Sequence, residues 1–408
     1  MSPSILFSSY HSYLDWTSGA ARATRATLHA LARAGWKVRA LCGSFLDSTT
    51  ADEREFVKTI QSVCANPKVS SGRCVVQGVS TKFRVFQFDD EGIEATLLLT
   101  AGAFSEAVPR YFLSKPSGDV FLSLLSTELS QRPVDVYATY GGYWAASLAA
   151  TLAKERGARR VFMLHNFSYE NRELFERFDR VVVPSQFARR FYFDRLGVRC
   201  DVVPPIGRRP LPPKSPVERQ YATLVNPAVE KGAFFFLGLA RELNQRRPDV
   251  RLLAVESRAT CEQFRNAPDV AKLRNLYKVE RAPNLDLVYA SSKMTLLPSL
   301  WNESFGLTAL ESALAGAPVL CSDRGATKEC VDEEGNSPLV LHIPPRFVQN
   351  VPIIPTAEEV EPWVEQVVKI WDDPAYAQAQ LESQRKCAER FAPERAAERN
   401  VEFFNSLL

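Results

Sequence analysis

Short apolar runs alternate with longer segments of helical pattern along most of this chain. The clearest example is a strand over Ser4–Ser9, a helix over Gly19–Ala34 that Gly35 ends, and a second strand over Lys37–Cys42. Alternation of this kind predicts parallel sheets with helices on both faces, which is an α/β fold of the Rossmann-like class.

The alternation stops once, at residues 204–216, where the sequence reads PPIGRRPLPPKSP. Dense proline and glycine predict a stiff, exposed connector and hence a domain boundary. With 408 residues, the chain has room for two cores. We therefore expect a Rossmann-like domain over 1–206 and a second one over 207–389. A C-terminal helix at about 390–408 would return to the first domain.

The two predicted domains have similar element series. In the first we expect further strands at Arg84–Phe88, Val134–Thr139, Arg160–Leu164, Arg180–Val183 and Asp201–Val203, and helices near 118–131, 142–156 and 185–196. In the second we expect strands at Tyr221–Val225, Arg251–Val255, Met294–Leu297 and Pro318–Ser322, and helices near 232–246, 284–291, 306–315 and 325–331. The segments 45–80 and 105–117 give no clear pattern, and 356–408 predicts two or three helices without a strand.

The segment 297–322 reads LPSLWNESFGLTALESALAGAPVLCS and predicts a strand, a loop and a helix that begins near Phe305–Gly306. The backbone N–H groups of Phe305, Gly306 and Leu307 would point out of the helix start, where the helix dipole favours a phosphate. Glu303 would lie beside this anion site, and Glu311 about two turns deeper.

Two glutamates at this spacing suit a ligand with a diphosphate between two hydroxyl-rich rings. Such a ligand is a nucleotide sugar, with its pyranose at Glu303 and its ribose at Glu311. Taken alone, two carboxylates eight positions apart are more often a loop glutamate and a solvated helix glutamate. The interpretation therefore depends on the whole stretch.

That stretch, ESFGLTALESALAGAPV, resembles the signature of family 4 glycosyltransferases (glycosyl transferases group 1), E-S-F-G-L-x-x-L-E-A-x-A-x-G-x-P-V. The resemblance implies the GT-B fold, in which two Rossmann-like domains face each other across a cleft. It makes 1–206 the acceptor domain and 207–389 the domain that binds the nucleotide-sugar donor. It also implies retaining transfer of a sugar from a nucleotide diphosphate sugar of the UDP, GDP or ADP type to an unidentified hydroxyl-bearing acceptor. It assigns Glu303 to catalysis and Ser304, Phe305, Gly306, Leu307 and Glu311 to donor binding.

The segment 221–232, YATLVNPAVEKG, is similar to the part of the family in which a strand is followed by Gly-Arg and then Glu-Lys-Gly. The resemblance makes Lys231 the cation for the donor diphosphate. Alone, it would be an exposed lysine of a first helical turn. Asn226 stands where the family has arginine, and an asparagine can donate hydrogen bonds but carries no charge. We include Asn226 and Lys231 among the catalytic residues.

Two residues of the first domain complete the expected site. Gly19, in the segment DWTSG, opens the first long helix and would give a second anion contact for the donor. His165 ends a predicted strand in VFMLHN, where family members commonly carry a histidine near the reacting sugar. A lone histidine is more often structural, but its placement favours the catalytic interpretation.

The resemblance implies front-face displacement, with no cofactor besides the nucleotide sugar and no divalent metal, because a cation and a helix dipole replace it. Three alternatives remain open. They are a nucleotide-sugar epimerase of the same fold, a phosphorylase that holds pyridoxal phosphate, and a catalytically weak scaffold that binds sugar nucleotides.

Charge and targeting signals limit the partners and the location. A net charge of +3 gives no reason to expect nucleic acid. The sequence shows no signal peptide and no apolar run of membrane-spanning length, so we expect a cytoplasmic protein. Its basic residues concentrate at Arg189, Arg190, Arg195, Arg199, Arg208 and Arg209. We favour a solvated surface for this Arg189–Arg209 region; the alternative is peripheral contact with the inner face of a membrane.

Overall fold

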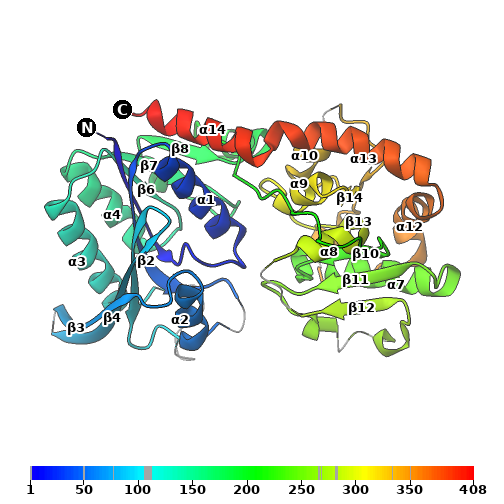
Figure 1. Ribbon diagram of the computed structural model, residues 1–408, viewed down its shortest axis with the longest axis horizontal. Coiled ribbons are helices and arrows are strands. Elements are labelled where there is room, and N and C mark those ends of the chain that lie inside the picture. The colour runs from blue at the N-terminus through cyan, green and yellow to red at the C-terminus, as the bar shows by residue number, and fades with distance from the viewer. Residues whose placement is uncertain are drawn as a thin grey trace. The chain divides into compact units, whose positions relative to one another are not determined.

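The computed structural model describes residues 2–48, 51–76, 78–104, 113–264, 267, 269–280, 284–332, 334–349 and 351–408. The chain divides into two compact units (Figure 1). Unit 1 comprises Met1–Pro205 together with Ala396–Leu408, and unit 2 comprises Ile206–Arg395. Each unit is a sheet with helices packed on it, which confirms the predicted α/β class.

Unit 1 is built on a nine-stranded sheet of order β3-β4-β5-β2-β1-β6-β7-β8-β9. Its strands are β1 (Ser4–His11), β2 (Lys37–Phe45), β3 (Lys68–Val76), β4 (Val79–Asp90), β5 (Ile93–Thr100), β6 (Val136–Thr139), β7 (Arg159–Met163), β8 (Arg180–Val183) and β9 (Asp201–Val202). The strands from β5 to β9 in this order are parallel, as predicted. The prediction is wrong at one edge, where β4 pairs antiparallel with both β3 and β5. Only Glu91 and Gly92 separate β4 from β5, and a parallel pair needs a much longer crossover.

The helices of unit 1 cover both faces of this sheet (Figure 1). They are α1 (Gly19–Arg33), α2 (Glu53–Gln61), α3 (Lys115–Gln131), α4 (Trp144–Glu155), α5 (Arg172–Phe175), α6 (Gln186–Leu196) and, from the C-terminal segment, α14 (Pro393–Asn405). Along β1, Ile5 and Phe7 pack into the core under α1, whereas Leu6 and Tyr10 pack under α3 and α4. Successive side chains of a strand point to opposite faces, so one apolar strand serves both cores.

The segment that contains most of α14 completes unit 1. Phe403 and Phe404 are buried in the core that also holds Leu28 of α1. The Asn400 amide donates to the Pro204 carbonyl at 2.9 Å, and its oxygen accepts from the Thr27 hydroxyl at 2.9 Å. This helix is therefore an integral part of a unit whose other elements lie before residue 206.

Unit 2 is built on a six-stranded, wholly parallel sheet of order β12-β11-β10-β13-β14-β15. Its strands are β10 (Tyr221–Val225), β11 (Arg251–Val255), β12 (Leu276–Val279), β13 (Ser292–Leu297), β14 (Val319–Ser322) and β15 (Val340–Leu341). Its helices are α7 (Ala233–Arg246), α8 (Asp286–Ser291), α9 (Leu307–Leu314), α10 (Thr327–Val331), α11 (Arg346–Gln349), α12 (Ala357–Asp372) and α13 (Pro374–Ala388). Counted along the chain, the strand order is 3-2-1-4-5-6, which is the Rossmann order.

Among its parallel strands, each sheet reverses its strand order at one place. In unit 1 the reversal lies between β1 and β6, and in unit 2 it lies between β10 and β13. Open α/β sheets bind ligands outside the carboxyl ends of the strands at such a switch point. The residues that follow β1, β2 and β6, and those that follow β10, β11 and β13, are therefore the expected site residues.

Candidate active site

Lys231 lies at the switch point of unit 2, in a short 3-10 helix, η1 (Val229–Lys231), between β10 and α7. Gly232 follows with a φ of +83°, and a Cβ at this position would lie 2.0 Å from the Pro298 carbonyl oxygen. Only glycine allows this approach. The Leu300 N–H also donates to the Glu230 carbonyl at 3.0 Å. The segment that carries Lys231 is thus fastened to the loop that follows β13.

Glu303 lies in that loop and forms an ion pair with the Lys231 ammonium group. Lys231 Nζ lies 2.5 Å from Glu303 Oε1, which also accepts from Ser299 Oγ at 2.6 Å and from Trp301 Nε1 at 3.1 Å. Burial by itself raises the pKa of Glu303, but the charge and hydrogen bonds of Lys231, with the Ser299 and Trp301 donors, outweigh it and hold the pKa below its usual range. Glu303 is therefore a fixed carboxylate at neutral pH.

A second cation, which the sequence analysis did not identify, lies beside this pair. Arg258 follows β11, and its Nη2 lies 2.8 Å from Glu230 Oε1. The Arg258 guanidinium carbon is 5.8 Å from the centre of the Trp301 indole, and Lys231 Nζ is 5.1 Å from the same ring. Trp301 is 39% exposed, so two cations flank an indole that solvent reaches.

Asn226 positions the loop that carries Arg258. Its Oδ1 accepts from the Ala259 N–H at 2.9 Å, and its own N–H donates to the Val255 carbonyl at 2.9 Å. Its φ is +60°, in the left-handed region that asparagine tolerates better than most residues with a Cβ. We expected the Asn226 side chain to face phosphate; the structure shows its oxygen bound to the backbone beside Arg258.

The residues after Glu303 lead into α9, which begins at Leu307 rather than at Phe305–Gly306 as predicted. Gly306 precedes it with a φ of +102°, and a Cβ there would meet Thr327 Oγ1 at 3.1 Å. Phe305 is buried and packs edge-on against Phe391, so its side chain belongs to the core. Ser304 is half-buried in the turn before Gly306.

Glu311 lies inside α9, as predicted, but its side chain is only 1% exposed. Its Oε2 accepts from the Tyr289 hydroxyl at 3.0 Å. A ribose hydroxyl therefore reaches Glu311 only when neighbouring side chains move.

In unit 1, Gly19 and His165 lie near carboxyl ends of strands. Gly19 is the first residue of α1, and the Ser18 hydroxyl caps this helix by accepting from the Ala21 N–H at 3.4 Å. His165 follows β7, and its Nε2 lies 3.3 Å from Thr24 Oγ1. Burial lowers the pKa of His165 to about 4, so the imidazole is neutral at physiological pH. It also lines a small cavity together with Thr27 and Asn400.

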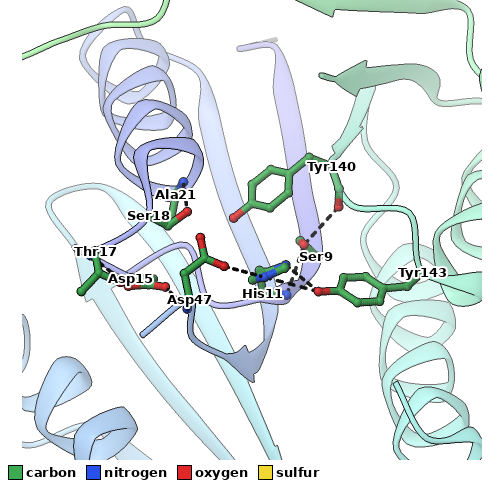
Figure 2. Close-up of polar contacts among 9 residues, drawn as sticks. All are labelled: Ser9, His11, Asp15, Thr17, Ser18, Ala21, Asp47, Tyr140 and Tyr143. Carbon is green, nitrogen blue, oxygen red and sulfur yellow. Dashed lines mark hydrogen bonds and ion pairs between the residues drawn. The ribbon is translucent and has the colours of Figure 1, made fainter. Parts of the chain in front are cut away.

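Figure 2 shows a further polar cluster at the switch point of unit 1, which the sequence analysis did not identify. His11 ends β1, Asp47 follows β2, and Tyr143 follows β6. His11 Nε2 lies 3.2 Å from Asp47 Oδ1, and the Tyr143 hydroxyl lies 2.7 Å from His11 Nδ1. Polar residues at the ends of neighbouring predicted strands were the available signal in the sequence.

Comparison with known proteins was most specific for unit 2. Residues 215–341 match the family described as glycosyl transferases group 1. The matched residues lie within unit 2, so the similarity to a glycosyl transferases group 1 domain is a property of that unit. The matched range contains five residues of the site: Asn226, Lys231, Arg258, Glu303 and Glu311.

A curated relative aligns with part of the chain. The lipopolysaccharide 1,2-N-acetylglucosaminetransferase of Salmonella typhimurium is 23% identical over 203 residues, which are 44% of this chain and 53% of that enzyme. The chain therefore spans about half the length of this relative, and the alignment by itself does not extend to the whole enzyme.

Solved structures resemble the chain over its full length. A glycosyltransferase from Rickettsia africae has a TM-score of 0.67 at 15% identity and covers 100% of this chain and 98% of its own. The Anabaena protein HepE, solved in complex with UDP-glucose, has a TM-score of 0.66 at 17% identity, with 99% of each chain covered. These neighbours confirm the predicted GT-B fold, and at such identities they establish the fold alone.

The arginines between 189 and 209 are divided between the two units. Arg208 and Arg209 belong to unit 2, where Arg208 pairs with Asp286 and Arg209 with Glu389. In unit 1, Arg195 pairs with Glu170 at 3.0 Å. Within the described part of the chain, no helix combines the length and apolar character needed to cross a membrane. Peripheral membrane contact stays a prediction.

Proposed function

We propose that this protein is a retaining glycosyltransferase that moves a sugar from a nucleotide diphosphate sugar to a hydroxyl-bearing acceptor. The observation that carries the proposal is the Lys231–Glu303 pair, joined at 2.5 Å at the switch point of unit 2, within the range that matches glycosyl transferases group 1. A cation for phosphate and a carboxylate for sugar hydroxyls stand together where a Rossmann sheet binds its ligand.

The charges around this pair suit a diphosphate. Lys231 and Arg258 bring two positive charges to one exposed indole, and the start of α9 adds the positive end of a helix dipole. Within the described residues, the hydrogen bonds to the Glu303 carboxylate all reach Oε1, which makes Oε2 the oxygen for a sugar hydroxyl. Arg258 supplies the charge that Asn226 lacks.

Transfer with retention then follows front-face displacement. The bond between the anomeric carbon and the diphosphate oxygen breaks, and the acceptor oxygen bonds to that carbon from the same face. The acceptor proton passes to the departing phosphate oxygen. Lys231 and Arg258 stabilise the negative charge that develops on the leaving group, so the reaction needs no divalent metal.

The similar proteins support a UDP-sugar as donor. HepE was solved with UDP-glucose, and the pneumococcal O-GlcNAc transferase GtfA, at 12% identity and a TM-score of 0.61, with UDP and GlcNAc. The Salmonella relative is named as an N-acetylglucosaminetransferase. We therefore place UDP-hexoses and UDP-N-acetylhexosamines before GDP- and ADP-sugars.

A thermal-shift screen of the full chain with UDP-, GDP- and ADP-sugars tests donor binding, and NMR of the anomeric product tests retention. We expect stabilisation by a UDP-sugar, transfer in the presence of EDTA and a product with the donor configuration. Inversion or strict dependence on a metal would contradict the mechanism. Conversion of the donor sugar without acceptor would favour an epimerase, and binding without any transfer or hydrolysis would favour a scaffold.

A further inference from the structure

The polar cluster of His11, Asp47, Tyr140 and Tyr143, here called the unit 1 cluster, follows three neighbouring strands. His11 ends β1, Asp47 follows β2, and both tyrosines follow β6. These strands are adjacent in the order β2-β1-β6, and the strand order reverses between β1 and β6. The cluster therefore stands at the place where an open α/β sheet binds a ligand.

The contacts within the unit 1 cluster hold His11 between a carboxylate and a phenol (Figure 2). His11 Nε2 is 3.2 Å from Asp47 Oδ1, and His11 Nδ1 is 2.7 Å from the Tyr143 hydroxyl. The His11 and Asp47 side chains keep 15% and 16% of their surface exposed. These groups are thus ordered by one another and still reached by solvent.

Tyr140 provides a second, independent observation. Its side chain is 6% exposed, and its hydroxyl finds no hydrogen-bond partner among the residues that the structure describes. Its ring centre lies 6.0 Å from that of His11 and 5.5 Å from that of His165. In Figure 2 the hydroxyl points toward the side where Asp47 and Ser18 lie. Buried hydroxyls are rarely left without a partner, so this one indicates a ligand group.

Two carboxylates lie next to each other at the unit 1 cluster. Asp15 lies next to Asp47, whose N–H donates to Asp15 Oδ2 at 2.5 Å. Burial raises the pKa of Asp15, and the Asp47 carboxylate raises it further. Two adjacent carboxylates repel a phosphate, whereas carboxylates, imidazole and phenol together match the hydroxyls of a neutral sugar.

We propose that the unit 1 cluster binds hydroxyl groups of an uncharged carbohydrate, which is the acceptor if the proposed function holds. Asp47 accepts from one hydroxyl, His11 and Tyr143 hold a second, and the Tyr140 hydroxyl finds its partner in the bound sugar. Phosphorylated sugars are disfavoured at this place.

Two tyrosine variants separate ligand binding from structure. Tyr140→Phe keeps the ring and removes a hydroxyl that has no partner in the described part of the chain, so thermal stability should stay unchanged or rise. Tyr137→Phe is the matched control, because the buried Tyr137 hydroxyl bonds to Ser8 Oγ at 2.7 Å. We expect Tyr137→Phe to lower the unfolding temperature by about 2–4 °C and to leave sugar binding unchanged.

Sugar binding is measured by NMR of the imidazole groups in the 15N-labelled full chain, which has only four histidines. The probes are free glucose, galactose, mannose and N-acetylglucosamine, with glucose 6-phosphate as the charged comparison. We expect at least one neutral sugar to shift the His11 signal and not that of the exposed His342. Tyr140→Phe should weaken this binding roughly three- to tenfold, and Asp47→Asn at least as much.

The proposal is overturned if none of the four neutral sugars shifts His11, if glucose 6-phosphate binds as tightly as glucose, or if Tyr140→Phe leaves binding unchanged. A parallel thermal shift with UDP reports on the donor site alone. Stabilisation by UDP without a His11 response removes the acceptor inference and leaves the glycosyltransferase proposal standing. A His11 response without UDP binding does the reverse.

Discussion

The two units place polar clusters at equivalent points of their sheets and give them opposite chemistry. In unit 1, Asp47 follows β2, His11 ends β1 and Tyr143 follows β6. In unit 2 the residues after β11, β10 and β13 include Arg258, Lys231 and Glu303. Strand order thus fixes where a site forms, while the few residues at the end of each strand decide whether the site suits hydroxyls or phosphates.

The strongest test of this contrast removes the main cation of unit 2. Lys231→Ala should lower transfer by about two orders of magnitude or more, because it removes a donor that stabilises the departing diphosphate. Steady-state kinetics with a UDP-sugar measure the loss. Lys272→Ala is the matched control, since Lys272 is a highly exposed lysine of the same unit paired with Asp269. Near-normal turnover of Lys231→Ala would show that Lys231 does not stabilise the departing diphosphate.

The second test uses the buried histidines of unit 1. His165 has a pKa lowered to about 4 by burial, and the pKa of His29 is also lowered, mainly by burial. Unfolded histidine takes up a proton near pH 6.5, so the unfolded state binds more protons between pH 6.5 and 4, and stability falls as the pH falls through this window.

For His165 alone the loss is about 2 kcal/mol between pH 7 and pH 5. Hydrogen exchange followed by mass spectrometry shows which unit loses stability at low pH, and we expect the loss in unit 1. His165→Asn should flatten the dependence, whereas His342→Asn, at an exposed site of unit 2, should not change it. Equal acid sensitivity of wild type and His165→Asn would show that His165 is not buried as a neutral group.

A smaller effect is expected from Arg258. Arg258→Ala should lower kcat/KM about tenfold, since one charge-assisted contact to phosphate is lost, and Arg258→Lys should keep most of the activity. Asn226→Ala should give a smaller loss in the same direction, because it frees the backbone beside Arg258. Arg251→Ala, at the opposite end of β11, serves as the control. Equal activity of Arg258→Ala and Arg251→Ala would leave Lys231 as the cation that matters in this site.

The smallest expected effect concerns Glu311. Glu311→Gln should weaken UDP binding roughly three- to fivefold by calorimetry, through the loss of a charged acceptor for ribose. Tyr289→Phe removes the hydroxyl that bonds to Glu311 and should lower stability more than UDP affinity. Unchanged UDP affinity in Glu311→Gln would make this carboxylate structural.

Much of the fold could be predicted from the sequence, because strands such as Tyr221–Val225 are short apolar runs between clear helical patterns. The edge strands β3, β12 and β15 were missed, and so was β5, which lies between β4 and β2. The exposed side chains of β3, such as Val75, lack the continuous apolar run of a buried strand. Two-residue β15 is too short to give any periodic signal.

The site could be predicted only in part. The segments around Lys231 and Glu303 could be recognised because each combines a glycine, a charged residue and the start of a helix in a known motif. The direct contact between Lys231 and Glu303 could not be predicted, because it depends on the close approach of Gly232 to Pro298, and these two residues are far apart in the sequence. Arg258 and His11 occur in segments without a motif, and only the pairing of neighbouring strands brings them to the same edge as their partners.

The return of α14 to unit 1 has a consequence for the order in which the protein is made. Strands β1 to β9 leave the ribosome first, yet the core beneath α1 lacks Phe403 and Phe404 until unit 2 has been synthesised. Domains usually fold in the order of their synthesis. Here we expect the reverse for the final step. Unit 2 can complete its fold from one continuous stretch of chain. The nascent unit 1 exposes part of its apolar surface, where chaperones can bind, until α14 has been synthesised and packs on it.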